Sequence, residues 1–405
     1  MVRKEIAERI FAYRQEIIDI LKQLVATPTV NPPGRNYKSC SDYLSHILSE
    51  WKIDHKVIVV PDGDYPRFSI IGSLGDGGKA LHFHGHYDVV PASSPEAFKP
   101  RFKEGRLFGR GSSDMKGGLT AMLFALRLLK NLDVSLKGRL TFSIVPDEET
   151  GGLLGTQYLF EKKLLPPANV LGMIMPEPTS GAIWNGNKAA LTLKVSIEGK
   201  HAHVAIAHQG VNAFEHMVNL ANSFFKLRKK IEKREAKPSV GHPEAARSVI
   251  LLGGQSGSGF NFNAVPENSF LTIDCRFNPK EDPAEMKKEI EKVLAEHRSR
   301  GIKINAAVLQ EGEPSLFTPE TNLAQTLLRS IRDITGSRPS FELCPGLCEI
   351  RFFNKRGIPA YAYGPGMLEV AHGPQEHVFV SDIISCAQVY SLTAVELLSP
   401  YPRRK

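Results

Sequence analysis

The chain has 405 residues, of which 42% are hydrophobic and 23% are charged, as is usual for a globular protein. A single hydrophobic core stops growing before this length, so we expect two domains. No apolar run approaches the roughly 18 residues that a membrane-spanning helix needs, which argues against a membrane protein.

The formal net charge is +8 and the isoelectric point is near 9.1. Much of the excess positive charge lies at 226–237 and in the tail 403–405, which we interpret as a solvated helix face and a chain end. Nucleic-acid binding is disfavoured because no aromatic residues are interleaved with these charges. Attraction of a carboxylate-bearing substrate stays open.

Two further features indicate a cytoplasmic protein. The cysteines are odd in number and scattered, which favours reduced thiols over a disulfide framework: Cys40, Cys275, Cys344, Cys348 and Cys386. The first 25 residues predict one amphipathic helix with charges throughout rather than a signal peptide.

The next part of the chain alternates strand and helix patterns. Strands are predicted at 55–61, 67–75, 80–90, 138–146 and 169–176, and helices at 39–51, 117–132 and 150–165. This alternation predicts an α/β fold with a mostly parallel sheet that helices cover on both faces.

The pattern changes near residue 186. The predicted order becomes strand, helix, strand, strand, helix, strand (βαββαβ), which is typical of a small two-layer α+β domain. Patterns like the first ones return in the last part, with a strand leading into a loop at 352–366 and a closing helix at 384–399. We therefore expect a catalytic domain at 1–185 and 311–405, with a domain inserted at 186–310.

Three segments between residues 81 and 149 carry the chemistry. LHFHGHYDVVP, FGRGSSDMKGG and IVPDEETGG each end an apolar run or loop with residues that bind metals. The carboxyl ends of neighbouring strands meet at one crevice of an α/β sheet. Imidazole and carboxylate ligands gathered there suit zinc, cobalt or manganese.

The histidines illustrate why the combination matters more than any one residue. His82, His84 and His86 share one face of a strand, and a lone histidine is more often structural than a ligand. Asp88, one step further along that face, can accept the second ring N–H of His86, as outer carboxylates do for metal-bound histidines. We leave His82 and His84 as packing or supporting residues.

The acidic positions are also ambiguous individually. Asp114 alone is equally well explained as an N-cap of the following helix. Glu148 and Glu149 are adjacent at a strand end and point in different directions, so one can bind a metal while the other acts as a base. Glu177 in MPEPT carries little weight alone.

Taken together and in this order, HGHYDVVP, GRGSSDMKGG, PDEETGG, PEPT and AHGPQEHV resemble the M20 family of metallopeptidases and deacylases. The resemblance covers nearly the whole chain. It implies a site for two divalent metal ions, usually zinc, with cobalt or manganese as alternatives. It also implies that the inserted domain is a lid that mediates homodimerisation.

The resemblance assigns roles to individual residues. It implies that Asp114 bridges both metals, that His86 and Glu177 complete one metal's ligands, and that Glu149 and His372 complete the other's. It implies that Glu148 is the general base and that Asp88 supports His86.

The inserted domain carries further matched positions. His203 corresponds to a histidine that reaches the partner subunit's site and stabilises the oxyanion, and Asn263 and Arg276 to contacts with the substrate. Gly346 and Arg351 match a loop beside the substrate. That loop has Cys348-Glu349 where the family often has Thr-Asp or Ser-Asp, which leaves the substrate's identity open.

The resulting hypothesis is a metal-dependent amidohydrolase that cleaves an N-acyl amino acid, of the acetylornithine deacetylase or succinyl-diaminopimelate desuccinylase type. A dipeptidase or carboxypeptidase would use the same site on a peptide bond. A catalytically silent, metal- or ligand-binding relative is the alternative from another class, but its signature would be a lost base or ligand.

Overall fold

A computed structural model describes residues 2–61, 64–132, 136–234 and 247–399. Within these, the chain forms two compact units. The first contains residues in 1–186, 317–342 and 348–405, and the second those in 187–316 and 343–347. The basic tail 403–405 and the end of the basic run 226–237 lie outside the described residues.

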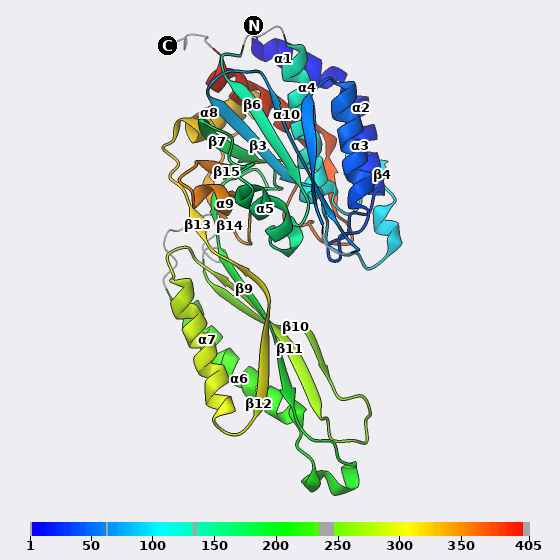
Figure 1. Ribbon diagram of the computed structural model, residues 1–405, viewed down its shortest axis with the longest axis vertical. Coiled ribbons are helices and arrows are strands. Elements are labelled where there is room, and N and C mark those ends of the chain that lie inside the picture. The colour runs from blue at the N-terminus through cyan, green and yellow to red at the C-terminus, as the bar shows by residue number, and fades with distance from the viewer. Residues whose placement is uncertain (1, 62–63, 133–135, 235–246, 400–405) are drawn as a thin grey trace. The chain divides into compact units, whose positions relative to one another are not determined.

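The first unit is built on a mixed sheet with the strand order β1-β2-β6-β3-β7-β15-β8 (Figure 1). The contiguous strands β6, β3, β7 and β15 are parallel, and β1, β2 and β8 pair antiparallel at the flanks. The parallel core therefore confirms the predicted α/β class. The strands are β1 (Asp54–Val60), β2 (Arg67–Leu74), β3 (Ala80–His86), β6 (Arg139–Val145), β7 (Val170–Met175), β8 (Ile183–Asn187) and β15 (Ala360–Ala362).

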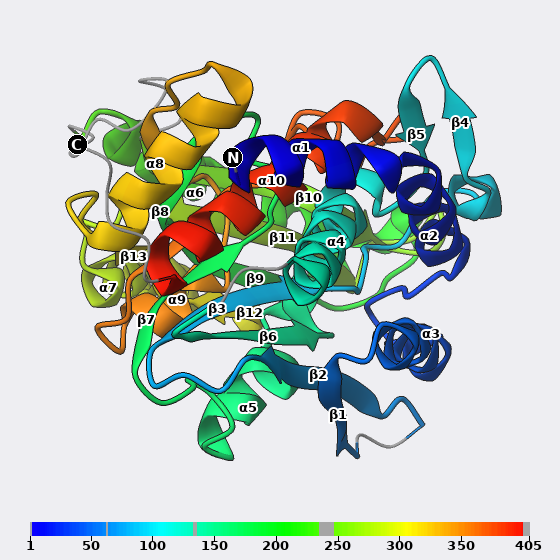
Figure 2. The ribbon, with the colours of Figure 1, turned by 90° about the horizontal axis from the view of Figure 1, so that it is seen from above.

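Helices cover both faces of this sheet (Figure 2). On β3 the side chains alternate between the faces: Phe83 contacts Tyr390 of α10, whereas His82 and His84 contact Phe353 of α9. The helices of this unit are α1 (Val2–Ala12), α2 (Arg14–Ala26), α3 (Tyr37–Glu50), α4 (Gly117–Asn131), α5 (Tyr158–Glu161), α8 (Asn322–Thr335), α9 (Ile350–Asn354) and α10 (Val380–Leu398).

A small antiparallel sheet with the order β16-β5-β4 completes the first unit. Its strands are β4 (Arg101–Lys103), β5 (Arg106–Phe108) and β16 (His377–Phe379). The sheet joins segments far apart in sequence, because His377 pairs with Phe108. Two short strands, β13 (Ser315–Leu316) and β14 (Phe341–Cys344), occur where the sequence passes between the units.

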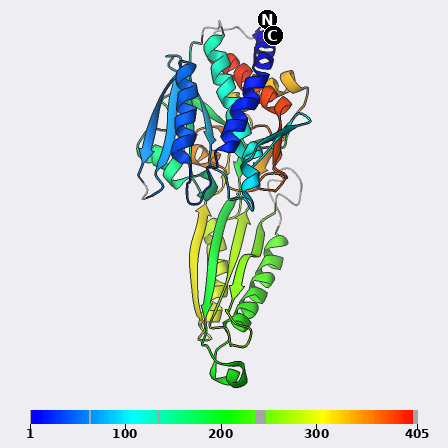
Figure 3. The ribbon, with the colours of Figure 1, turned by 90° about the vertical axis from the view of Figure 1, so that its right-hand side faces the viewer.

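The second unit has the predicted order βαββαβ. Its antiparallel sheet, in the order β10-β11-β9-β12, packs against α6 and α7, which contact each other (Figure 3). Asn212 and Asp282 cap α6 and α7 by accepting backbone N–H groups of the first turn. The elements are β9 (Ala189–Glu198), α6 (Ala213–Glu232), β10 (Val249–Ser258), β11 (Asn268–Phe277), α7 (Pro283–Arg298) and β12 (Lys303–Gly312).

Three predicted elements differ from the structure. The first helix is divided at Tyr13, whose N–H bonds to the carbonyl of Ile10, three residues back. The helix predicted at 150–165 contains only short turns and α5, because Gly151 and Gly152 both adopt positive φ. Part of the segment predicted as strand and loop at 352–366 is the end of α9.

All five cysteines are buried, and none of them forms a disulfide. Among the described residues, no helix combines the length and apolar character that crossing a membrane requires.

A close backbone contact fixes α4 against the end of β7. A Cβ atom added to Gly118 would lie 1.8 Å from the carbonyl oxygen of Pro176, which no side-chain rearrangement can relieve. Gly118 lies four residues after Asp114, and Pro176 immediately precedes Glu177. The same contact therefore sets the separation of two candidate metal ligands.

We predict that Gly118→Ala lowers the free energy of unfolding by about 1–3 kcal/mol or more, because it overpacks a rigid contact. Gly78→Ala is the matched control, since a Cβ atom there meets nothing within 4 Å. Urea unfolding of both variants measures the difference. Equal stability of the two variants would show that α4 can shift without cost.

Candidate metal centre

The candidate ligands converge because three parallel strands end at one edge of the sheet. β3 lies between β6 and β7. His86 is the last residue of β3, Glu148 and Glu149 follow β6 in a short turn, and Glu177 follows β7 by two residues. The carboxyl ends of parallel strands form the usual binding crevice of such sheets.

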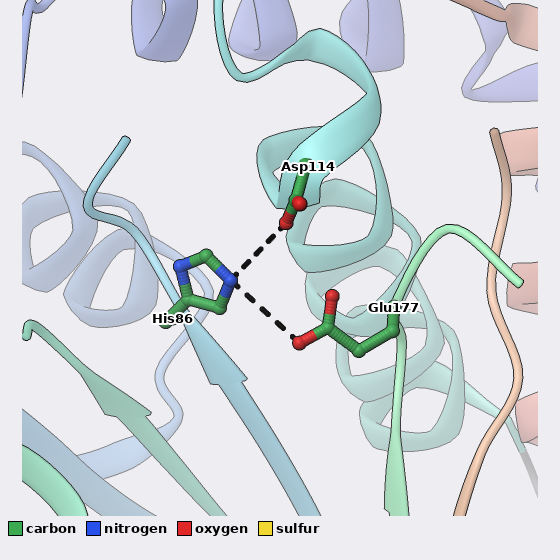
Figure 4. Close-up of side chains that lie close together, drawn as sticks. All are labelled: His86, Asp114 and Glu177. Carbon is green, nitrogen blue, oxygen red and sulfur yellow. Dashed lines mark ion pairs between the residues drawn. The ribbon is translucent and has the colours of Figure 1, made fainter. Parts of the chain in front are cut away.

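One group of potential ligands consists of His86, Asp114 and Glu177 (Figure 4). His86 Nε2 lies 3.3 Å from Asp114 Oδ1 and 3.7 Å from Glu177 Oε1. Asp114 belongs to the turn Ser112–Lys116 that leads into α4, where its backbone is non-helical and its peptide bond to Met115 is cis.

A second group uses the other oxygen of Asp114. His372 Nε2 lies 3.3 Å from Asp114 Oδ2 and 3.4 Å from Glu149 Oε1. One carboxylate therefore takes part in two groups of three ligands, which is the arrangement that two neighbouring cations require. All five residues predicted as ligands are brought together.

Asp88 organises the residues around this site. It is fully buried, and its Oδ1 lies 3.2 Å from His86 Nδ1. The backbone N–H groups of Glu148 and Glu149 donate to its two oxygens at 3.2 and 3.1 Å, and Asn31 Nδ2 donates at 2.9 Å. Asp88 therefore orients the His86 ring and the turn that carries both glutamates.

The electrostatics of the site reflect crowded buried carboxylates. Burial raises the pKa of Glu148 and Glu177 well above the usual range, and Asp114 adds repulsion to both. Although burial opposes its protonation, the carboxylates of Asp114 and Glu149 raise the pKa of His372 to about 11. The pKa of His86 is likewise raised by Asp114 and Asp88 against the effect of burial.

These residues fit a pair of divalent cations. Within the described residues, the buried atoms His86 Nε2 and Glu149 Oε1 have no hydrogen-bond partner, although buried polar atoms nearly always have one. Cations would satisfy both atoms and reduce the repulsion among the carboxylates. Histidine nitrogen with carboxylate oxygen is also a donor set that zinc accepts.

His82 and His84 lie on β3 and belong to neither ligand group. Both are buried, and each places a ring nitrogen within 2.9 Å of Ser143 Oγ. The other ring nitrogen of His84 lies 2.9 Å from Glu349 Oε2, so the Cys348-Glu349 segment is anchored to β3 through a buried pair.

Two predicted residues of the second unit are adjacent to each other. His203 forms an isolated bridge with Ala264, and the N–H of Val204 donates to the carbonyl of Asn263 at 3.0 Å. His203 is exposed, and its Nδ1 accepts the N–H of Ala205 at 3.1 Å. In a neutral ring this bond leaves the proton on Nε2, which is then a free donor.

The remaining predicted substrate residues have individual environments. Arg276 on β11 donates to Asp274 Oδ2 at 3.0 Å within its own unit. Gly346 belongs to the second unit and has open space where a Cβ atom would lie. Arg351 is buried and donates to the carbonyl of Gly151 at 2.7 Å, beside the turn that carries Glu148. Their roles stay predictions.

The sequence interpretation missed three residues that support the site. Asn31 binds Asp88, and Arg110 pairs with Glu376 beside the second group of ligands. Arg110 and Glu376 lie inside the motifs GRGSSDMKGG and AHGPQEHV, so their position gave a signal. Asn31 lies in the proline- and glycine-containing segment TVNPPG, which gave no such signal.

Residues 82–396 match the sequence profile of peptidase family M20/M25/M40. The chain belongs to this family, and the resemblance noted in its motifs is confirmed. With this match, the fold and the two ligand groups define a metal-dependent hydrolase of amide bonds.

Curated relatives extend over nearly the whole chain. A probable succinyl-diaminopimelate desuccinylase of Staphylococcus epidermidis is 26% identical over 400 residues, covering 93% of this chain and 96% of the relative. A succinyl-diaminopimelate desuccinylase of Buchnera aphidicola is 28% identical over 408 residues, covering 95% and 99%.

Solved structures share the fold at lower identity. The dipeptidase Dug1p from Saccharomyces cerevisiae has a TM-score of 0.81 at 16% identity, and human carnosine dipeptidase 1 has 0.80 at 15%; both comparisons cover 98% of this chain and 99% of the other. A dinuclear metal-binding M20 peptidase from Bacillus subtilis, YXEP, has 0.62 at 15% identity, covering 96% and 99%.

We predict that uptake of cations releases protons at pH 7, because the raised pKa values of His86, His372 and Glu177 favour protonated ligands without metal, and a ligand must lose its proton to bind a cation. Affinity should therefore rise as the pH increases toward the His372 pKa of about 11. Calorimetry in buffers of different ionisation enthalpy measures the proton count.

The variant His372→Gln should release about one proton fewer on cation uptake, because it lacks one of the imidazole ligands. The variant His46→Gln is the control, since His46 is exposed on α3, where its Nε2 lies 3.5 Å from Glu50 Oε1. Affinity that does not change between pH 6 and pH 9 would contradict the protonation of these ligands in the metal-free protein.

Proposed function

We propose that this protein is a two-zinc amidohydrolase that removes the acyl group from an N-acyl amino acid, as a succinyl-diaminopimelate desuccinylase does. The observation that carries the metal assignment is Asp114, whose two oxygens face two separate ligand groups. Cobalt and manganese accept the same donors. The substrate class rests on the full-length relatives.

The proposed ligand sets follow the two groups. His86, Asp114 and Glu177 would hold one cation, and Asp114, Glu149 and His372 the other. Bound there, the cations would polarise the amide carbonyl and lower the pKa of water toward about 7.

Glu148 is proposed as the general base. The attacking water gives a proton to the Glu148 carboxylate, its oxygen bonds to the carbonyl carbon, and Glu148 returns the proton to the departing nitrogen. The C–N bond then breaks, which leaves a carboxylic acid and an amine, and the proton of the acid passes to the amine. Asp88 supports this role by holding the N–H of Glu148.

A dipeptidase is the second candidate, favoured by the structural neighbours. At 15–16% identity these neighbours support the fold, whereas the relatives at 26–28% identity support the acylated substrate. In either case Arg276 is proposed to bind the substrate carboxylate, since a guanidinium offers a planar fork of donors.

We also propose a homodimer formed through the second unit, which would act as the lid domain. Phe214, Val218 and Phe225 form an exposed apolar stripe along α6, and Val249 and Leu251 are exposed on the edge strand β10. Exposed edge strands and apolar patches of this kind are usual sites of self-association. Cysteines that form no disulfide support a reducing, cytoplasmic setting.

The function is tested by turnover of zinc-loaded protein on N-succinyl-diaminopimelate, N-acetylornithine, other N-acyl amino acids and dipeptides. We expect one acylated amino acid to be preferred. Faster hydrolysis of dipeptides would show that the protein is a dipeptidase, the second candidate. Absence of hydrolysis of every substrate by protein with two metals bound would overturn the proposal.

In the same assay, Glu148→Gln should retain two metals and lose about 10²–10⁴-fold in kcat, which is the usual contribution of a positioned base. Glu161→Gln, an exposed carboxylate on α5, is the matched control. Near-normal turnover by Glu148→Gln would remove its assigned role.

The oxyanion role of His203 across the dimer predicts complementation between two inactive variants. Equal mixing of His203→Ala with Glu148→Gln chains should restore about a quarter of wild-type activity, since half of the dimers are mixed and each has one intact site. His208→Ala, in the same exposed turn, should stay active alone. Verified mixed dimers without activity would contradict the arrangement.

A further inference from the structure

We propose that Arg110 and Glu376 form a buried clamp that positions Asp114 and His372 for the second cation. The two residues are 266 positions apart and form an ion pair of 2.5 Å. This inference rests on the two-metal function proposed above and assigns a role to residues outside both ligand groups.

Glu376 holds the Asp114 side of the site. Its side chain is 1% exposed, and its Oε1 accepts the backbone N–H groups of Ser113 and Asp114, each at 3.1 Å. These bonds fix the turn that presents the Asp114 carboxylate to both ligand groups. Its Oε2 is left for Arg110, so both oxygens of the carboxylate are engaged.

Arg110 holds the His372 side. Its side chain is 6% exposed; Nη2 donates to the carbonyl of His372 at 2.9 Å, and Nη1 donates to Glu376. His372 has a φ of 60°, a conformation that non-glycine residues adopt only when the surroundings fix it. The bond from Arg110 is one such constraint at the ligand itself.

The small sheet explains why these residues meet. β5 and β16 pair antiparallel, and the N–H of Gly109 donates to the carbonyl of Glu376 at 3.0 Å. Arg110 therefore lies just after the end of β5, next to Glu376, which lies just before the start of β16. The clamp is part of the backbone pairing that joins the Asp114 turn to the last part of the chain.

The chemistry of the clamp predicts a selective effect. Within the described residues it makes no hydrogen bond to His86 or Glu177, which complete the first ligand group. It contacts two of the three ligands of the second group, Asp114 and His372, but only Asp114 of the first group. Its loss should weaken the second cation more than the first.

The test compares Glu376→Gln and Arg110→Lys with wild type by calorimetric titration with cobalt(II), with cobalt absorption as a second readout. Glutamine keeps the volume but places an NH₂ donor against either Arg110 or the backbone N–H groups. Lysine keeps the charge but not the fork that reaches both partners.

We expect the Kd of the second cobalt ion to rise about 10–100-fold in Glu376→Gln, as for other residues that orient metal ligands, with the first Kd within about threefold. Glu104→Gln is the matched control, because it removes an exposed Arg–Glu pair of the same small sheet. It should leave both constants unchanged.

If folded Glu376→Gln binds both cobalt ions with wild-type Kd values, the proposed role of the clamp is wrong. It is also wrong if the Kd values of both ions rise by the same factor. If Glu376→Gln does not fold, the same comparison is made with Arg110→Lys, in which the Kd of the second cobalt ion should rise more than that of the first. Metal binding is measured without substrate. A wild-type protein that binds two ions but hydrolyses no amide therefore refutes the proposed function and leaves the clamp intact.

Discussion

The constraint on which this structure depends is the burial of several carboxylates in one small volume. Asp114, Glu148, Glu149 and Glu177 lie close enough to perturb one another's pKa, and burial deprives each of water. Such a cluster is costly unless cations or hydrogen bonds compensate for it. Asp88 and the supporting loops form the framework that holds these negatively charged carboxylates in position for a cation.

The framework arises from the sheet. Parallel pairing of β6, β3 and β7 delivers three chain segments to one edge, and a close contact between Gly118 and Pro176 brings α4 against them. The last part of the chain then adds His372. The ligands thus come from rigid strand ends and from loops that are bonded to each other, which is how a metal site achieves fixed geometry.

Much of this could be predicted from the sequence, for physical reasons. Strand ends rich in histidine and carboxylate residues predicted that His86 and Glu149 would lie at one crevice, and the family resemblance added Glu177. The structure places the three residues in two ligand groups that share Asp114. The partner of a buried charge could not be predicted, because pairing of Arg110 with Glu376 depends on the register of β5 against β16. The shortened helix after Glu149 was missed because positive φ at Gly151 and Gly152 overrides the apolar periodicity that follows.

The position of β15 has a consequence for synthesis of the protein. Ala360–Ala362 is fully buried between β7 and β8, yet it belongs to the last part of the chain. While a ribosome is still translating the earlier part, β7 has an unpaired edge in the nascent chain. Unpaired edges promote aggregation. The interval before residue 360 emerges is therefore the stage at which a chaperone would be most useful to this protein.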